Sequence, residues 1–364
     1  MKRLLPFFVV LALSGAVEIV STPAGGDFGA PRLLVPAPKE PDLQHLAWPK
    51  VLRAKDGRLH VFCLAGFSHT QRGSPVMFVS SDGGRTFTGP TVLMKFGEGE
   101  WRHSGNLAAG FAEDGALVVL AMGMNAGSAR TGIFGWRSPD SGRTWQPADT
   151  SALSGKAGSV YGNVFAVPGK GLAVAGHFRK GATMRQQGIW ISFSKDQGRS
   201  WSEAQVVTTG PEVEPAMIYT AGKIVGLIRT SPSDRYIQVV SEDKGATWKQ
   251  TGVFVGAGTS LPSPFLAADP RDPKLLWALQ TDRNPNGLGD GQGKIWLWSA
   301  RLDKLEWNRE GLVARFPSRS QWRAADYGYP WMAHLGGREW LLVFYGGEHA
   351  GPNSLWGMKL RVPR

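Results

Sequence analysis

The stretch SPDSGRTW, residues 138–145, decides the fold, because nearly the same eight letters occur four times along the chain. The other copies are SSDGGRTF from Ser80, SKDQGRSW from Ser194 and SEDKGATW from Ser241, and all four fit the pattern Ser-x-Asp-x-Gly-x-(Thr/Ser)-aromatic. An altered fifth copy, SARLDKLEW, starts at Ser299 with one extra residue and no glycine. Full copies recurring at intervals of roughly 50 to 60 residues predict a repeated supersecondary unit.

Each copy has the chemistry of a tight turn. A short Asp side chain accepts hydrogen bonds from backbone N–H groups further along the turn, and Gly allows a positive φ. The aromatic residue that ends each copy can pack as a wedge between neighbouring sheets. We therefore assign an architectural role, in preference to catalysis or metal binding, to Asp82, Asp140, Asp196 and Asp243. The corresponding wedges are Phe87, Trp145, Trp201 and Trp248.

Six short apolar runs, each preceded by a turn, form a second repeat in phase with the first. They are rich in Val, Leu, Ile and aromatic residues and are bounded by Gly and Pro, a pattern typical of buried strands. With their turns, the runs are DGRLHVFCLAG (56–66), DGALVVLAMG (114–123), GKGLAVAGHF (169–178), AGKIVGLIRT (221–230), PKLLWALQT (273–281) and GGREWLLVFYGG (336–347). One short strand is expected before each run and two after it.

Four strands per unit and six units predict an all-β fold, a six-bladed β-propeller of four-stranded antiparallel blades. No turn copy follows Leu360, so the last blade lacks an outer strand of its own. The N-terminal stretch PRLLVPAP (31–38) is placed to supply that strand, which closes the ring and leaves no long free edge. Residues 31–364 then form a single domain. The 48 Gly, 24 Pro and 15 Trp suit a fold with many turns and aromatic wedges.

The N-terminal residues have the layout of a secretory signal peptide. Two basic residues, Lys2 and Arg3, precede the apolar run LLPFFVVLALSGAV, which ends in small residues suited to cleavage after Ala16. We expect residues 1–16 to be the signal peptide, with cleavage in the region 16–26. The mature protein is then secreted or periplasmic, without stable membrane insertion. The alternative is an uncleaved membrane anchor, for which the apolar run is short.

The single cysteine and the net charge limit the partners of an exported chain. Cys63 has no second cysteine to pair with and lies in an apolar run, which favours a buried thiol over a reactive one. The formal net charge of +12 attracts anions, but the basic residues are spread along the chain and form no basic arm. We therefore expect an acidic glycan as the partner, no nucleic acid and no cofactor. The oligomeric state stays open.

The repeats resemble the Asp-box repeats of the sialidase (neuraminidase) superfamily, and the resemblance covers nearly all of the chain after the expected signal peptide. It implies a site at the centre of the propeller, where the first strands of the blades begin and the second strands end. The residues expected there are His45, Trp48, His69, Arg102, His103, Asn125, Arg130, Tyr161, Asn163, His177, Arg179, Glu214, Arg229, Asp282, Arg283, Tyr329, Glu348 and His349.

The stretch VEPAMIYTAGKIVGLIRT (213–230) matches the superfamily most closely. Sialidases carry a Glu at the start of the first strand of a middle blade and an Arg at the end of its second strand. Glu214 and Arg229 fit that arrangement, fifteen residues apart across one hairpin. A charge at the head of a buried strand needs a partner, so the two residues are expected to act as a pair.

A second match, DYGYPWMAHL (326–335), starts the last blade. Tyr329 occupies the place of the sialidase nucleophile, with Tyr327 as the fallback. Sialic acid carries a carboxylate on its reacting carbon, so an anionic nucleophile would be repelled and a neutral phenol would not. The resemblance implies that Glu214 draws the proton from Tyr329 as the phenol attacks.

Two positions differ from the superfamily pattern. Sialidases have an Arg just before Ile-Pro in the first blade, but here the text is LAWPKV, with Ala47 or Trp48 in that place. They also have an Asp acid/base in the following loop, but here GFSHTQRGSP (66–75) contains no carboxylate. His69 is our candidate for the proton donor, with Arg72 as a nearby charge.

The resemblance implies an arginine cluster that binds the substrate carboxylate through paired hydrogen bonds. Arg229 and Arg283 are its members, with Arg323 as the alternative to Arg283. The other expected substrate-binding residues are His45, Arg102, His103, His177 and Arg179. We expect no metal, because the histidines have no recognised ligand spacing.

Three functions are compatible with this sequence. The first is hydrolysis of a terminal sialic or related acidic sugar, which requires Glu214 within about 3 Å of the Tyr329 hydroxyl. The second is a same-fold enzyme with shifted chemistry, in which acid–base work or metal binding is shared by His45, His69, His103 and His177. The third is glycan or protein binding without catalysis, favoured by a central channel plugged by Trp48 and Trp331.

Overall fold

The computed structural model describes residues 27–127, 129–153, 157–179, 188–231, 233–254, 260–283, 292–318 and 325–364. The expected signal peptide (1–16), its cleavage region (16–26) and Arg323 lie outside these residues. Within the described residues the single helical element is a short 3-10 turn, η1 (Ser151–Leu153). No helix in this part of the chain is long and apolar enough to cross a membrane.

The chain is all-β, and within each group of strands the pairing is antiparallel and follows the chain order. Two groups of four are separate sheets, whereas parallel pairing between neighbouring groups joins the others into an eight-stranded and a nine-stranded sheet. The first three groups are β3 (His45–Arg53), β4 (Leu59–Gly66), β5 (Ser74–Ser80) and β6 (Thr88–Val92); β7 (Trp101–Phe111), β8 (Leu117–Asn125), β9 (Thr131–Ser138) and β10 (Gln146–Ala148); and β11 (Ser159–Val167), β12 (Gly171–His177), β13 (Ile189–Ser194) and β14 (Gln205–Val206). The next two are β15 (Val213–Thr220), β16 (Lys223–Arg229), β17 (Tyr236–Ser241) and β18 (Lys249–Phe254); and β19 (Phe265–Asp269), β20 (Asp272–Asp282), β21 (Gln292–Arg301) and β22 (Trp307–Ser318). All six predicted apolar runs are second strands of such groups.

The last group joins the two ends of the chain. Its strands β23 (Ala325–Gly336), β24 (Glu339–Glu348) and β25 (Asn353–Arg361) pair antiparallel. The N-terminal strands β1 (Asp27–Phe28) and β2 (Arg32–Val35) both pair with β25. β2 lies within PRLLVPAP, so this stretch pairs with the last strand of the chain.

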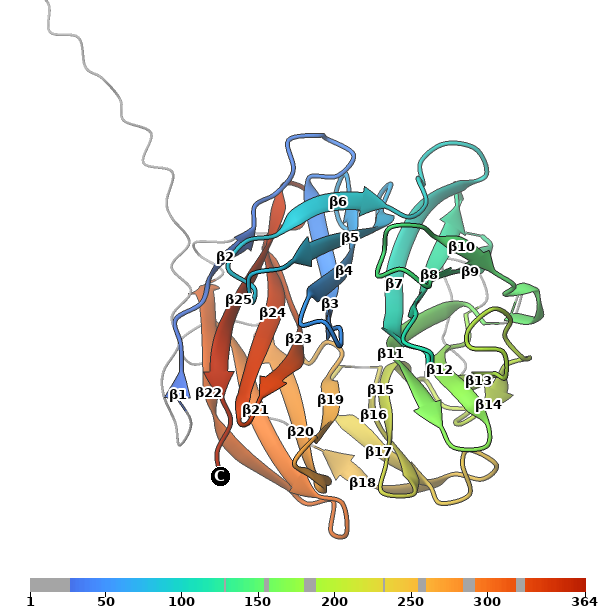
Figure 1. Ribbon diagram of the computed structural model, residues 1–364, viewed down its shortest axis with the longest axis vertical. Coiled ribbons are helices and arrows are strands. Elements are labelled where there is room, and N and C mark those ends of the chain that lie inside the picture. The colour runs from blue at the N-terminus through green and yellow to red at the C-terminus, as the bar shows by residue number, and fades with distance from the viewer. Residues whose placement is uncertain are drawn as a thin grey trace, which may run out of the picture.

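The sheets are arranged around a common centre, as in a propeller (Figure 1). The first strand of each group lies towards the centre, and the last strands, such as β6, β14 and β18, lie towards the outside. Each first strand therefore brings its residues close to those of the others, which is the arrangement that a central site needs.

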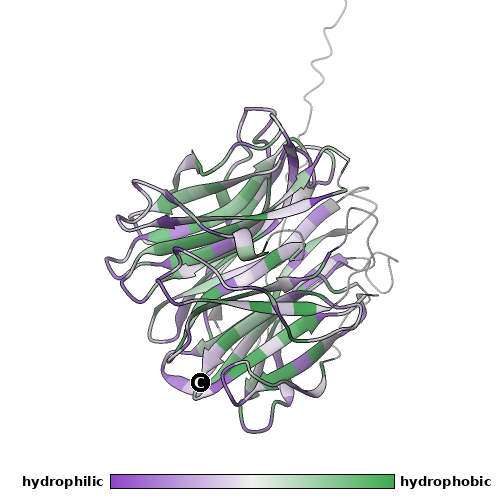
Figure 2. Ribbon diagram, turned by 90° about the vertical axis from the view of Figure 1, so that its right-hand side faces the viewer, coloured by the Kyte–Doolittle hydropathy of each residue, from purple (hydrophilic) through white to green (hydrophobic). Residues whose placement is uncertain are grey.

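Apolar side chains fill the space between the sheets. Strands β4, β13 and β17 are buried along their whole length, and Figure 2 shows hydrophobic residues along the strands and hydrophilic residues at the turns. Of the predicted wedges, Trp201 is buried, and the ring of Trp145 meets that of Phe62 edge-on at 5.9 Å. Cys63 is free and buried, and burial raises the pKa of its thiol, so it is an unreactive core residue as expected.

The repeated turns have the predicted structure. In the copy at Ser138, the Asp140 carboxylate accepts the backbone N–H of Arg143 at 3.1 Å, the N–H of Thr144 at 2.9 Å and the Thr144 hydroxyl at 2.7 Å. Gly142 has a φ of 88°. The bonds from Thr144 lower the pKa of Asp140 to about 2. The aspartates of these turns are therefore architectural, as their repetition predicted.

An Asp140→Ala variant is expected to unfold at a lower temperature than wild type at pH 7, because the turn loses its acceptor. The folded pKa lies below the ordinary value of 3.8, so the stabilisation is complete above pH 4 and is lost as the pH falls towards 2. The difference in unfolding temperature between the variant and wild type should therefore become smaller between pH 4 and pH 2. Thermal denaturation at a series of pH values measures it, with exposed Asp303→Ala as the control. Equal unfolding temperatures at pH 7 would contradict the assignment.

Candidate active site

Three strand starts share an unusual backbone. Trp48, Glu214 and Tyr329 each precede a proline, and their φ angles are 55°, 49° and 48°. A residue before proline is normally extended, and a positive φ is uncommon outside glycine. At each position the strand shifts register against its neighbour, so the side chain leaves the regular ladder. The Trp48 ring lies 6.1 Å from the Tyr329 ring, and Glu214 bonds to Tyr329. We call this meeting point the hub.

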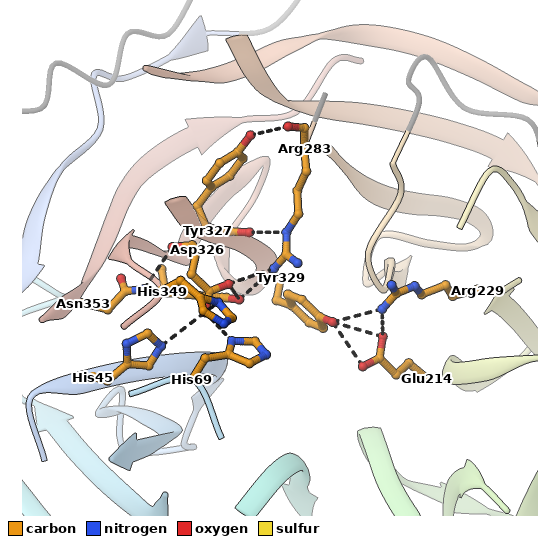
Figure 3. Close-up of polar contacts among 11 residues, drawn as sticks. His45, His69, Glu214, Arg229, Arg283, Asp326, Tyr327, Tyr329, His349 and Asn353 are labelled. Atoms are coloured by element: carbon orange, nitrogen blue, oxygen red, sulfur yellow. Dashed lines mark hydrogen bonds and ion pairs between the residues drawn. The ribbon is translucent and has the colours of Figure 1, made fainter. Parts of the chain in front are cut away.

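Tyr329 and Glu214 form the pair predicted from the sequence (Figure 3). The Tyr329 hydroxyl lies 3.1 Å from each carboxylate oxygen of Glu214, and the two residues are 4% and 7% exposed. Asn106 donates to Oε1 of the carboxylate at 3.1 Å, and the Ser263 hydroxyl bonds Oε2. The carboxylate is thus held in a fixed orientation against the phenol by donors from other sheets.

The charges at the hub give the two partners different proton affinities. Burial and the Glu214 carboxylate raise the pKa of Tyr329 to about 12, so the phenol is neutral at physiological pH. Burial also acts to raise the pKa of Glu214, but Arg229, Ser263 and His177 together outweigh it and lower that pKa to about 2. The resting pair is therefore a neutral phenol facing a carboxylate.

Two arginines flank the phenol, as predicted. Nη1 of Arg229 lies 2.6 Å from Oε2 of Glu214 and 3.2 Å from the Tyr329 hydroxyl. The guanidinium carbon of Arg283 lies 5.4 Å from the centre of the Tyr329 ring. Arg283 is held from behind, since it donates to the Tyr327 carbonyl at 3.0 Å. Tyr327, the fallback nucleophile, points its hydroxyl to the Arg283 carbonyl at 2.7 Å and is absent from the Glu214 contacts.

Asp326 is the functional residue that the sequence analysis missed. Its side chain is 1% exposed, and its Oδ2 faces His45 Nε2 at 3.2 Å, His69 Nδ1 at hydrogen-bond distance and His349 Nδ1 at 3.9 Å. The other oxygen, Oδ1, accepts the Tyr345 hydroxyl at 2.8 Å. We call His45, His69, Asp326 and His349 the Asp326 cluster (Figure 3). Its position three residues before Tyr329, at the head of a buried strand, is the signal that could have found it.

The remaining predicted residues divide into two groups. His177 lies beside the hub: its Nδ1 accepts the backbone N–H of Glu214 at 3.2 Å, and burial lowers its pKa to about 4, so it is neutral and positions Glu214. Arg102 and His103, predicted as substrate-binding residues of the centre, lie at the start of β7. Arg102 is exposed and donates to a nearby backbone carbonyl at 2.5 Å, and His103 faces the backbone of Arg72. β7 shifts register twice, between Trp101 and His103 and between Ser104 and Leu107, and the β7 residue that bonds Glu214 is Asn106 in the second shift.

Arg179 lies away from the phenol. Its Nη1 contacts the sulfur of Met124 at 3.6 Å, although the Glu214 charge still acts on it. It lines a cavity of about 860 Å³ together with Trp101 and Arg130. This cavity lies beside β9 and β10, and neither Tyr329 nor Glu214 lines it.

A buried lysine fills the space beneath the hub. Lys50 has no exposed surface, and its Nζ lies 4.3 Å from the ring centre of Tyr161 and 4.4 Å from that of Trp331. Burial lowers the pKa of Lys50 to about 7, against the attraction of the Glu214 carboxylate. Trp331, one of the two predicted plugs, therefore packs around this lysine below Glu214 and Tyr329.

The sequence matches the family model of the BNR repeat-like domain over residues 95–337. The chain belongs to this family. This match confirms the predicted Asp-box (BNR) repeats, and solved sialidases share the fold of this BNR repeat-like protein. No curated protein matches the sequence.

Three solved structures show the extent of the similarity. A Dyadobacter fermentans protein of unknown function is 18% identical, with a TM-score of 0.68 over 91% of this chain and 99% of that one. The Hadza microbial sialidase Hz136 is 15% identical, with a TM-score of 0.65 over 92% and 68% of the two chains. The NanB sialidase of Streptococcus pneumoniae is 13% identical, with a TM-score of 0.63 over 93% and 71%. At these identities the likeness establishes the fold of the BNR repeat-like protein, and the site has to be judged on its own geometry.

Proposed function

We propose that this protein is an exported, sialidase-like glycoside hydrolase that removes a terminal sialic or related acidic sugar. The observation that carries the proposal is the Tyr329 hydroxyl, which lies 3.1 Å from both oxygens of Glu214 between two arginines. A neutral phenol next to a fixed carboxylate is a nucleophile with its base in place. Two guanidinium groups beside it suit a substrate that carries its own carboxylate.

The reaction proceeds in two displacements. The Tyr329 oxygen attacks the anomeric carbon while its proton moves to Glu214 and the bond to the leaving oxygen breaks. Because the Glu214 carboxylate is a far weaker base than a tyrosinate, the proton has to leave as the new C–O bond forms. Water then attacks the same carbon and gives a proton to His69, while the bond to the phenolic oxygen breaks and that oxygen recovers its proton from Glu214. The anomeric configuration is retained.

His69 is the proton donor for the leaving oxygen in this proposal. Its Nδ1 bonds the buried carboxylate of Asp326, and its side chain is 25% exposed, so the opposite ring nitrogen is accessible. The carboxylate orients the ring through Nδ1, so Nε2 points away from Asp326 and is the nitrogen that can pass a proton to the leaving oxygen. Asp326 and His69 together then take the place of the missing Asp in the loop 66–75.

The finer architecture belongs to the same proposal. We infer a closed ring of six blades, because contacts link β3 to β7, β7 to β11, β11 to β15, β15 to β19, β19 to β23 and β23 to β3. Pairing of β2 with β25 then gives the last blade its outer strand. Export rests on the N-terminal sequence alone, and cleavage near Ala16 is tested by sequencing the N-terminus of the mature protein.

A Glu214→Gln variant is expected to release methylumbelliferone from its α-sialoside at least about 100-fold more slowly than wild type, because the amide cannot take the phenol proton. The control is Glu212→Gln, two residues away, where the carboxylate bonds Thr208 at 2.9 Å outside the hub; its rate should equal that of wild type. Full activity in Glu214→Gln would refute the mechanism.

Trp48 favours a second candidate function, binding of a glycan without turnover. The ring is 4% exposed and lies against both Tyr329 and His69, with centroid distances of 6.1 and 4.9 Å. Its Nε1–H is buried and has no acceptor among the described residues, so the ring fills the centre of the hub as the predicted plug would. Retention of sialylated glycans on an array, together with no release of methylumbelliferone by wild type, would establish this function in place of hydrolysis.

A further inference from the structure

The Asp326 cluster gathers more ligand atoms than proton transfer needs. We propose that His45, His69, Asp326 and His349 bind one divalent first-row transition-metal ion, with Zn²⁺ as the best fit. Three of the four, His45, His69 and His349, were expected at the centre of the molecule. The metal-binding alternative grouped His45 and His69 with His103 and His177, and not with Asp326.

The positions of the donor atoms suit a small cation. His45 Nε2, His69 Nδ1 and an Asp326 oxygen all lie within 4.8 Å of one another, and His349 Nδ1 lies 3.9 Å from the same oxygen. Ligand atoms around a tetrahedral Zn²⁺ lie about 3.3 Å apart, given bonds of about 2.0–2.1 Å. Imidazole nitrogens with one carboxylate oxygen are a ligand set that zinc prefers to calcium or magnesium.

The hydrogen bonds of His45 supply an independent argument. Its Nδ1 lies 2.8 Å from the Gly351 carbonyl, which can only accept, so Nδ1 carries a proton. In the neutral ring Nε2 is then a lone pair, and it faces the Asp326 carboxylate at 3.2 Å. A metal ion between them accepts a lone pair from Nε2 and another from the carboxylate, whereas the same contact without an ion requires a proton on Nε2. A metal ion at the centre of the cluster satisfies both, and it satisfies the other two imidazoles as well.

The surroundings of the cluster hold the ligands in place, as metal sites require. Asp326 Oδ1 is occupied by Tyr345 at 2.8 Å, which leaves Oδ2 for an ion. The Asp326 backbone carbonyl accepts Asn353 at 2.9 Å. The loops that carry His69 and His349 are joined by a backbone hydrogen bond of 3.0 Å, and their rings stack with centroids 4.5 Å apart.

Exposure increases across the cluster from one side to the other. The side chains of His45 and Asp326 are each 1% exposed, that of His69 is 25% exposed and that of His349 is 54% exposed. An ion can therefore enter past His349, and only this exposed ring has to turn to complete the site.

Metal binding by the Asp326 cluster is a property separate from the proposed hydrolysis, and it can be measured without turnover of a substrate. Nδ1 of His69 cannot hold a proton and an ion together, so the metal-bound cluster and the proton-donating cluster are alternative states. Failure of one proposal therefore leaves the other standing.

Cobalt is the probe, because Co²⁺ replaces Zn²⁺ at such sites and is visible. The full mature chain, stripped with a chelator and dialysed, is titrated with Co²⁺ and followed by visible absorption and calorimetry. We expect intense d–d bands typical of four-coordinate nitrogen and oxygen ligation, saturation at one ion per chain, and loss of the bands when Zn²⁺ is added.

Three variants identify the ligands. His349→Ala alters an exposed side chain and Asp326→Asn keeps the shape of a buried one, and each should weaken Co²⁺ binding at least about 100-fold, more than the loss of a supporting residue does. The control is His334→Ala, a histidine that bonds the Gly337 carbonyl at 2.9 Å outside the cluster; it should bind as wild type does. If Asp326→Asn fails to fold, His349→Ala alone carries the comparison.

Absence of both heat and d–d bands in folded wild-type protein would overturn the proposal and leave a protonated histidine as the cation of the cluster. Equal weakening by His334→Ala, or unchanged binding in His349→Ala, would also overturn it, because the ion would then be bound elsewhere.

Discussion

A Tyr329→Phe variant is expected to hydrolyse an α-sialoside at least about a thousandfold more slowly than wild type, because phenylalanine has no hydroxyl to form the covalent bond. The substitution removes only the hydroxyl, which bonds Glu214 at 3.1 Å and Arg229 at 3.2 Å. The ring itself keeps its contacts with Trp48 and Tyr345. Steady-state release of methylumbelliferone measures the effect, and circular dichroism reports whether the sheets are intact.

The matched control is Tyr219→Phe, in the same strand as Glu214 but at its outer end and only partly buried. It should leave the rate unchanged. If Tyr329→Phe retained wild-type activity, the nucleophile assignment would be wrong even though the hub geometry would stand. Loss of activity in both tyrosine variants would indicate damage to the fold and not to the chemistry.

A Lys50→Met variant is expected to be more stable than wild type by a few kcal/mol at pH 7. Folding moves Lys50 from water to a site with no exposed surface, where burial lowers its pKa from 10.5 to about 7. That difference corresponds to about 5 kcal/mol that the charged form costs the folded state. Methionine has a similar length, carries no charge and packs against aromatic rings such as Tyr161 and Trp331. The gain is reduced by the loss of the cation–π contacts with these two rings.

The stability difference between Lys50→Met and wild type depends on pH. Between pH 7 and 10.5 the unfolded chain holds a proton on Lys50 that the folded chain has released, so the wild type gains stability as the pH rises. The advantage of Lys50→Met should therefore be complete below pH 7 and vanish towards pH 10.5. Urea denaturation at several pH values measures both, with Lys223→Met, whose amine lies 2.5 Å from Glu242 at the surface, as the control. A variant less stable than wild type at pH 7 would show that the ammonium group stabilises the hub.

The fold could be predicted because its signals are local and repeated. The hydrogen bonds that make SPDSGRTW a turn all lie within its own eight residues, from Ser138 to Thr144. The same holds for the apolar runs, which became second strands in every group. Only the last group of strands takes a strand from a distant part of the chain, since β2 pairs with β25. The absence of a turn copy after Leu360 indicated that such a strand was needed.

The site could be predicted only in part, because its contacts join residues that are far apart in the chain. Glu214 and Tyr329 were found through the motifs around them, although 115 positions separate them. Asp326 is the first residue of DYGYPWMAHL, but its role depends on contacts with His45 and His69. These two residues lie 281 and 257 positions away in the chain. The sequence LAWPKV does not indicate that the Lys50 side chain is buried. The bulge at Trp48 reverses the alternation of inward and outward side chains along the strand.

The bulges before proline have a consequence for how such a protein can change. Trp48, Glu214 and Tyr329 project from positions where the ladder is already interrupted, so exchanging any of them breaks no regular pair of strands. All three positions have a positive φ, which an unbranched side chain tolerates better than a β-branched one. An ancestor could therefore exchange an arginine for Trp48, or gain and lose a nucleophile, by single mutations that leave the folded frame viable throughout.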